Sequence, residues 1–197
     1  NFGLMTWASN ATMRINVGEN GADQILNMID TITTGGGTNL GSAMSLAQRY
    51  FNGPNSPQDP KAKGCQNNFL IVISDGDWYN GGTANSVAAQ LYNSGNKPNV
   101  STFVIGYAGY SNKNNYKTLA KAGGTTDALY ADTYQGLYVA LSKAIKESQI
   151  KDGLSFTSPA FKTETDSSGN VQKYMYQSIF TYVPSQQWEG RLKKFSL

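Results

Sequence analysis

The feature that most constrains the fold is an alternation of apolar runs and helical stripes along the first 150 residues. Residues 69–73 read Phe-Leu-Ile-Val-Ile, and residues 100–107 hold a second apolar run. Such runs are typical of strands buried on both faces, as in parallel sheets covered by helices. The expected strands are 2–8, 11–17, 69–73, 100–107 and 128–131, and the expected helices are 22–32, 40–51, 83–92, 115–122 and 133–150. This order predicts an α/β fold: a Rossmann-like, mostly parallel central sheet flanked by helices, with 11–17 as an antiparallel edge strand.

The pattern changes after Ile150. Residues 151–197 show no helical stripe, and their aromatic and β-branched residues are typical of strands. The stretches expected as strands are 161–163, 174–182 and 188–197. We therefore assign residues 1–150 to an α/β domain and residues 151–197 to a small β-rich extension.

Composition excludes several classes of function. The chain has no His and one Cys, which rules out a Ser-His-Asp triad, a His-ligated zinc and an internal disulfide. A scattered net charge of +3 does not indicate a nucleic-acid partner. The longest apolar run, 69–73, is too short to cross a bilayer, so we expect no membrane insertion. Charged residues make up only 15%, and a surface rich in Asn, Ser, Thr, Gln and Gly favours an extracytoplasmic location.

A glycine-rich loop, residues 35–42, precedes the helix expected at 40–51. Backbone N–H groups in such a loop can bind phosphate, but the loop lacks the Lys of a Walker motif and does not follow a strand. It is also interpretable as a connector between helices with Thr38 as N-cap. In a third interpretation, the Thr38 hydroxyl is a metal ligand.

Two carboxylates follow the buried strand at 69–73, in the string Ser-Asp-Gly-Asp over 74–77. Sites in open parallel sheets lie at the carboxyl edge, and oxygen donors there suit Mg²⁺ or another hard cation. Asp75 and Gly76 are equally compatible with a simple turn. A strand ending in Asp-x-Asp also begins phosphatases of the haloacid-dehalogenase type, in which Asp75 would be the nucleophile and Asp77 the acid/base.

In their order along the chain, these segments resemble a von Willebrand factor A domain. The matching segments are 2–7 as a central strand, 36–43 as the loop before a helix, 70–76 as the third-motif strand and 102–106 as the next strand. The resemblance implies a metal-ion-dependent adhesion site with Mg²⁺ or another divalent cation. It implies Thr38 and Asp75 as ligands, with Ser42 and Asp77 as weaker candidates, and an open position for a partner's carboxylate.

The chain departs from the family in one respect. The family's first metal segment, Asp-x-Ser-x-Ser, lies on a central strand that would precede Phe2, and the chain contains no such motif. The nearest string, 166–168, has the wrong spacing and place. Without that central strand, the strands at 2–8 and 69–73 would flank a gap, and their separation would be twice the usual strand spacing of ~4.8 Å. We expect another chain or segment to fill the gap, whether the protein was cleaved, the sequence is partial, or a separate chain supplies the strand.

The last residues resemble those of one particular group of proteins that contain such a domain. Residues 176–180, followed by Trp-x-Gly-x-Leu at 188–192, are similar to the segment after the A domain in PilY1-type proteins of type IV pili. In that family the segment leads into a C-terminal β-propeller. A generic β-hairpin is the alternative interpretation.

The resulting hypothesis is a binding module and not an enzyme. It is a pilus-associated, PilY1-like cell-surface protein at the pilus tip, acting in adhesion or pilus assembly. Its expected partners are a protein on a host surface or pilus components such as minor pilins. The alternatives are the phosphatase described above and a structural module with an inactive metal site. Cys65 lies in a Pro/Gly-rich loop and is expected to be an isolated thiol or to pair outside these residues.

Overall fold

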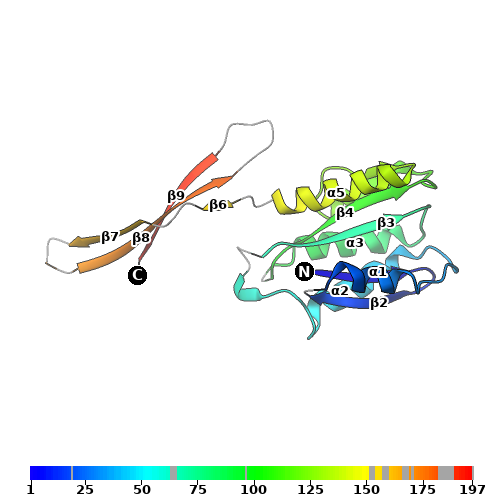
Figure 1. Cartoon of the computed structure of the whole chain (residues 1–197), viewed down its shortest axis with the longest axis horizontal. Coiled ribbons are helices and arrows are strands. Elements are labelled where there is room, and N and C mark those ends of the chain that lie inside the picture. Colours follow the sequence, from blue (N-terminus) through cyan, green and yellow to red (C-terminus); the bar gives the residue numbers. More distant parts are fainter. Residues whose placement is uncertain are drawn as a thin grey trace. The chain divides into compact units, whose positions relative to one another are not determined.

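The computed structural model contains two compact units, residues 1–145 and 146–197 (Figure 1). The residues that it describes are 1–18, 20–62, 66–95, 97–150, 154–156, 160–165, 169, 171–181 and 189–196. Cys65, the string 166–168 and Trp188 lie outside the described residues, so the expectations placed on them are not addressed by the structure.

A parallel three-stranded sheet forms the centre of the first unit. β3 (Asn68–Ser74) pairs with β4 (Val100–Tyr107) along its whole length, and β4 pairs with β5 (Leu129–Ala131). β4 is the middle strand, and its residues 102–106 are all buried, as its apolar run predicts. The predicted α/β class, with a mostly parallel sheet flanked by helices, is confirmed.

β1 (Phe2–Trp7) and β2 (Ala11–Gly18) form a separate antiparallel pair. Ile15 of β2 is buried whereas Arg14 and Asn16 on either side are exposed, which is the alternation expected of an edge strand. This pairing confirms the antiparallel strand predicted at 11–17. Within the described residues, β1 pairs only with β2 and β3 pairs only with β4, so the two sheets are not joined by strand pairing.

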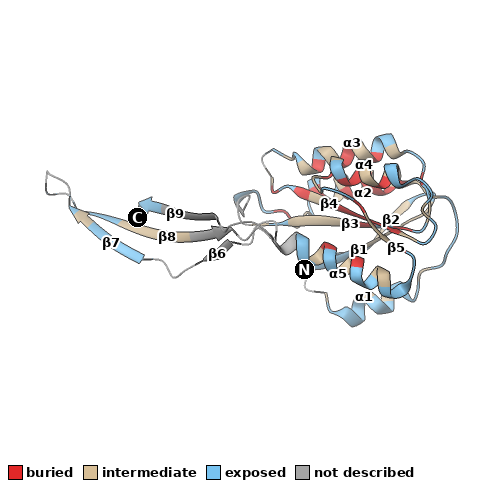
Figure 2. Cartoon of the chain, turned by 90° about the horizontal axis from the view of Figure 1, so that it is seen from above, coloured by how far each residue is buried: buried red, intermediate tan, exposed pale blue. Residues whose placement is uncertain are grey.

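Helices cover both sides of these strands (Figure 2). Their bounds are α1 (Ala22–Ile29), α2 (Leu40–Asn52), α3 (Gly81–Tyr92), α4 (Lys113–Ala122) and α5 (Tyr134–Ile150), with a short 3-10 helix, η1, at Pro60–Ala62. Figure 2 shows α2, α3 and α4 on one side of the sheet and α1 and α5 on the other. In the described part of the chain, no helix has the length and apolar character needed to cross a membrane.

Two apolar clusters correspond to these two layers. The larger includes Leu40 and Met44 of α2, Val104 of β4 and Leu119 of α4. The smaller joins Phe103 and Ile105 of β4 to Ala140 and Ala144 of α5, with residues 69 and 71 of β3 packed against it. Successive residues of β4 therefore enter opposite clusters, because side chains alternate between the faces of a strand.

Helix α1 differs from its sequence pattern. The apolar stripe at 22–32 predicts a packed helix, but α1 ends at Ile29 and none of its residues is buried. Leu26 and Ile29 are 56% and 44% exposed. The stripe forms the helix as expected, but it is only partly covered, since Ile25 and Met28 are half-buried.

The second unit is an antiparallel sheet. Its strands are β6 (Leu154–Phe156), β7 (Ala160–Thr165), β8 (Val171–Thr181) and β9 (Glu189–Ser196). β8 pairs with β6 and β7, and also with β9. The predicted strands are thus observed in their described parts, and β6 is an additional strand that the sequence did not indicate.

Candidate functional site

The carboxyl edge of the sheet in the first unit carries Thr38 and Asp75. Asp75 directly follows β3, and Thr38 lies two residues before α2 begins. The Tyr79 N–H donates to the Thr38 carbonyl at 3.0 Å, and the Asn39 N–H donates to the carbonyl of Ala8, just after β1, at 2.8 Å. The loop that holds Thr38 therefore lies between the end of β1 and the segment after β3. The structure brings the two segments to one edge, while their role as metal ligands stays a prediction.

The N-cap of α2 is Asn39, and this corrects the interpretation of Thr38 as N-cap. The Asn39 Oδ1 accepts a hydrogen bond from the Ser42 N–H at 3.2 Å. The same oxygen accepts from Asn80 Nδ2 at 3.0 Å, and Asn39 Nδ2 donates to the Ser9 carbonyl at 3.2 Å. Asn is among the favoured N-cap residues, so the sequence held this signal one residue further along. The Thr38 hydroxyl is thereby left without a capping role.

The start of α2 is packed closely against the segment after β3. A Cβ built on Gly41 would lie 2.8 Å from the Asn80 Cβ, so only glycine fits there without a shift. Ser42, the weaker ligand candidate in this turn, is half-buried and its N–H is used by the Asn39 cap. The loop that holds Thr38 is therefore fixed by backbone packing as well as by hydrogen bonds.

Asp75 is exposed, but its backbone is tightly held. A Cβ on Gly109 would collide with the Asp75 carbonyl, so the loop after β4 approaches closely there. The next carbonyl, that of Gly76, accepts from the Ser74 hydroxyl at 2.9 Å and from the Tyr116 hydroxyl at 2.5 Å. Among the described residues, neither the Thr38 hydroxyl nor the Asp75 carboxylate has a hydrogen-bond partner, so both sets of oxygens remain available to a ligand.

Asp77 has a different role. Its carboxylate accepts hydrogen bonds from the Ser111 hydroxyl and, at 3.1 Å, from the Asn112 N–H. These bonds, that from Ser111 first, lower the pKa of Asp77 because they favour the charged carboxylate. Through these hydrogen bonds, Asp77 connects the segment after β3 with the loop before α4. As a metal ligand it would have to share oxygens already in use.

An aromatic cluster supports this edge, and the sequence analysis did not find it. The rings of Trp78 and Tyr116 are 4.2 Å apart between centroids, and those of Tyr110 and Tyr130 are 4.9 Å apart. Tyr116 is fully buried, and burial raises the pKa of its hydroxyl. Tyr110 donates to Asp132 at 2.7 Å, which raises the pKa of Tyr110. The cluster connects the segment after β3 with the loop after β4, with α4 and with β5, and its members are too far apart in sequence to show any periodicity.

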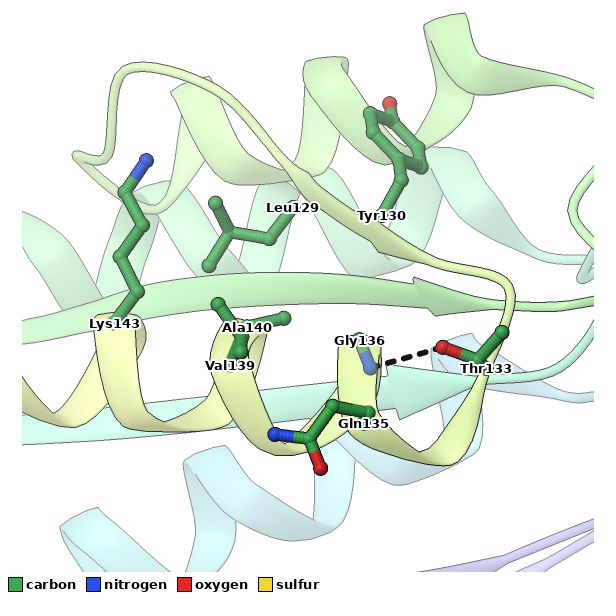
Figure 3. Close-up of a pocket in the computed structure, with 8 residues that line it drawn as sticks. All are labelled: Leu129, Tyr130, Thr133, Gln135, Gly136, Val139, Ala140 and Lys143. Atoms are coloured by element: carbon green, nitrogen blue, oxygen red, sulfur yellow. Dashed lines mark hydrogen bonds between the residues drawn. The ribbon is translucent and has the colours of Figure 1, made fainter.

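A pocket of about 400 Å³ lies elsewhere in the first unit, between β5 and α5 (Figure 3). The lining residues are Leu129, Tyr130, Thr133, Gln135, Gly136, Val139, Ala140 and Lys143. The Gly136 N–H donates to the Thr133 hydroxyl at 3.1 Å at one end of the pocket. None of the four predicted ligand residues lines it.

The residues at the carboxyl edge supply only some of the ligands that a bound cation would need. Hydroxyl and carboxylate oxygens are the donors that Mg²⁺ prefers. Within the described ranges, however, no three His, Cys, Asp or Glu side chains gather closely enough to hold a metal ion. Thr38 and Asp75 thus offer part of a coordination shell, and further oxygen donors would be needed to complete it.

Comparison with known proteins identifies the fold. Residues 1–143 match the family model of the von Willebrand factor type A domain. Two structures of proximal thread matrix protein 1 from the mussel byssus are similar, with identities of 18% and 17% and TM-scores of 0.53 and 0.56. Each match covers 75% of this chain and 34% of that protein, so this chain spans about a third of its length. At this identity the likeness concerns the fold alone. No curated protein sequence matches significantly.

Proposed function

The chain belongs to the von Willebrand factor type A family, and from this premise we propose that it is the metal-dependent adhesion module of a PilY1-like protein. Domains of this family are protein-interaction modules, so binding to another protein is the general activity. The proposed metal is Mg²⁺ or another divalent cation. The proposed partners are a protein on a host surface or the minor pilins of a type IV pilus.

The observation that supports this proposal most is the backbone hydrogen bond from Tyr79 to Thr38, because it holds the loop of Thr38 against the segment that begins with Asp75. The side-chain oxygens of Thr38 and Asp75 come from two separate loops and have no hydrogen-bond partner among the described residues. The surrounding loops are held by Asn39, Asp77 and Tyr116. A preorganised set of oxygens lowers the entropic cost of binding a cation. A cation so held keeps a coordination position for a carboxylate of the partner protein.

The association with pili rests on the second unit. Residues 176–180 lie in β8, and β8 pairs with β9, in which Gly190 and Leu192 of the predicted Trp-x-Gly-x-Leu stretch are found. Two further considerations favour a place outside the cell, and within the proposal that place is the pilus tip. Charged residues are few, and the similar byssus structures belong to a matrix protein.

The two alternative functions make different demands on the same edge. A phosphatase would use Asp75 as nucleophile and Asp77 as acid/base, yet Asp77 is bound by Ser111 and Asn112. A structural module with an inactive metal site agrees with the small number of acidic groups there. The family match favours a binding module over the phosphatase.

Calorimetric titration with Mg²⁺ separates these functions. The proposal predicts saturable binding that is weakened in Thr38→Ala and abolished in Asp75→Asn, with no turnover of phosphomonoesters. Asp23→Asn, which removes an exposed carboxylate from the first turn of α1, is the matched control and should bind as the unaltered chain does. Phosphomonoester turnover that is lost in Asp75→Asn would establish the phosphatase instead. Identical heats for the unaltered chain and Asp75→Asn would favour the structural module.

A further inference from the structure

The second unit has two faces of different character. Successive residues of a strand point to opposite faces of its sheet. On one face, the Glu164 carboxylate accepts hydrogen bonds from Lys194 at 2.9 Å and from the Tyr176 hydroxyl at 3.0 Å. The Lys194 ammonium also lies 3.6 Å from the centroid of the Tyr174 ring. These charged groups of the first face are therefore paired with one another.

The opposite face carries a row of apolar side chains that crosses three strands. Phe161 of β7 is paired with Met175 of β8, and Met175 is paired with Phe195 of β9. Directly opposite residues on neighbouring strands share a face, so these three side chains lie side by side. Phe161 and Phe195 are 68% and 39% exposed, and Val171, further along the same face of β8, is 63% exposed. Exposed apolar side chains gathered on one surface mark an interaction site.

Along β8, the residues of this face follow a pattern that is the same in both directions. Positions 171, 173, 175, 177 and 179 are Val, Lys, Met, Gln and Ile, so apolar and polar residues are arranged symmetrically about Met175. A two-fold axis along the row, between two stacked sheets, brings each residue of the row against its own copy. Position 171 then faces position 179 of the second copy, and Lys173 faces Gln177. Apolar residues meet apolar residues at these positions, so the face is complementary to itself.

The size of this face agrees with a weak dimer. At ~3.3 Å per residue and ~4.8 Å per strand, β7, β8 and β9 cover roughly 400 Å² on each face. Two copies in contact would bury about twice this flat area, and more when the contours of the side chains are followed, which approaches the ~1,000 Å² of a small specific interface. An interface of this size is expected to dissociate in the micromolar range. At lower concentrations the chain is single and Phe161 is exposed.

We propose that the apolar face of the second unit is a dimer interface, on which a second copy of the chain packs with its β8 antiparallel to the first. The two sheets would stack ~10 Å apart, as in β-sandwiches. A parallel arrangement would place Lys173 against its own copy, and like charges disfavour it. The dimer carries two first units, which raises the apparent affinity for a partner present in many copies. The proposal goes beyond the proposed function and does not depend on the metal.

Sedimentation equilibrium in a buffer with EDTA tests the interface independently of the metal. The proposal predicts a mass that rises from 21.3 kDa toward twice this value as the concentration increases to about 100 µM. Phe161→Lys should weaken association about tenfold or more, because it brings two ammonium groups together at the row. Leu192→Lys is the matched control, since it makes a similar change at a residue that is 68% exposed on the opposite face, and it should leave association unchanged.

A second variant tests the antiparallel arrangement. Gln177→Glu places a carboxylate opposite Lys173 of the other copy, so association should tighten about threefold or more at low salt and lose this gain at high salt. In the parallel arrangement, the same variant would bring two carboxylates together and weaken association. Weaker association of Gln177→Glu would therefore contradict the proposal.

Two further results would overturn the proposal. In the first, the chain keeps the mass of a single copy up to about 100 µM, which would mean that another molecule covers the face or that none does. In the second, the chain associates but Phe161→Lys has no effect, which would place the contact at a strand edge or in the first unit. Mg²⁺ binding by a chain that stays single would reject this proposal and leave the proposed function standing. Association without Mg²⁺ binding would do the reverse.

Discussion

The two units use β structure in opposite ways. In residues 1–145, β4 is covered on both faces, and Val104 and Ile105 are at most 1% exposed. In residues 146–197, the side chains of β7 are mostly exposed, with Phe161 at 68%. The first unit is therefore held by apolar burial. The described part of the second is held by strand pairing and by polar contacts across one face. The comparison shows that the same residue type is buried in one strand and exposed in another, as Phe103 of β4 and Phe161 of β7 are.

The largest expected effect comes from the same substitution in the two units. Phe103→Ala removes a ring that is 4% exposed and should lower the free energy of unfolding by about 3–5 kcal/mol, since it leaves a cavity in the smaller cluster. Phe161→Ala, at 68% exposure, should change it by less than about 0.5 kcal/mol. Urea unfolding of both variants measures the contrast. Equal losses would show that the second unit has a buried side at Phe161.

A smaller effect is expected at the loop beside Asp75. Gly109→Ala places a methyl group against the Asp75 carbonyl and should cost about 1–3 kcal/mol, because backbone must move. Gly82→Ala is the matched control, since a Cβ there meets no atom within 4 Å and Ala is the better helix former in α3. Thermal unfolding should show a loss for the first and no loss for the second. An unchanged stability in Gly109→Ala would indicate that the loop after β4 is not packed on Asp75.

Removing the cap of α2 should have an effect of about 1 kcal/mol. Asn39→Ala deletes the bond from Ser42 and the contacts with Ser9 and Asn80. Asn39→Asp keeps an acceptor for the cap and should restore most of the loss. Chemical unfolding of the two variants measures this difference. If Asn39→Asp were as unstable as Asn39→Ala, the helix cap would not be the stabilising contact.

The smallest effect on stability is expected in the second unit, at Glu164. Lys194 at 2.9 Å, the Tyr176 hydroxyl at 3.0 Å and Lys162 at 3.2 Å lower the pKa of Glu164 from 4.5 to about 2. Because the pKa in the folded state is depressed, this contribution is present above about pH 4.5 and is lost as the pH falls through about 2. NMR titration should show the low value, and Lys194→Met should raise it. The side chain of Glu164 is about one-third exposed, at 34%, so solvent screens these interactions and the change in unfolding free energy should be small. A pKa unaffected by Lys194→Met would remove Lys194 as the cause.

The sequence predicted best the strands and helices in which each face has the same surroundings along its whole length. β4 has no polar alternation because both its faces are covered, and the apolar stripe of α2 predicted the bounds of that helix to within a residue or two. The sequence could not predict that α1 is only partly covered, because an apolar stripe does not indicate what lies against it. For the candidate site, the order of the motifs along the chain predicted that the segments of Thr38 and Asp75 lie at one edge of the sheet. The contacts that fix this edge, such as Tyr116 with Gly76, join residues 40 apart and leave no local pattern.

Paramagnetic broadening by Mn²⁺ tests most directly whether Thr38 and Asp75 share a cation. Mn²⁺ takes the same oxygen ligands as Mg²⁺ and broadens NMR signals of nearby nuclei. At less than one equivalent, the account predicts that the amide signals of residues 38 and 75 broaden together, that Mg²⁺ reverses this, and that Asp75→Asn abolishes it. Broadening of only one of the two signals, or of exposed carboxylates throughout the chain alike, would contradict it.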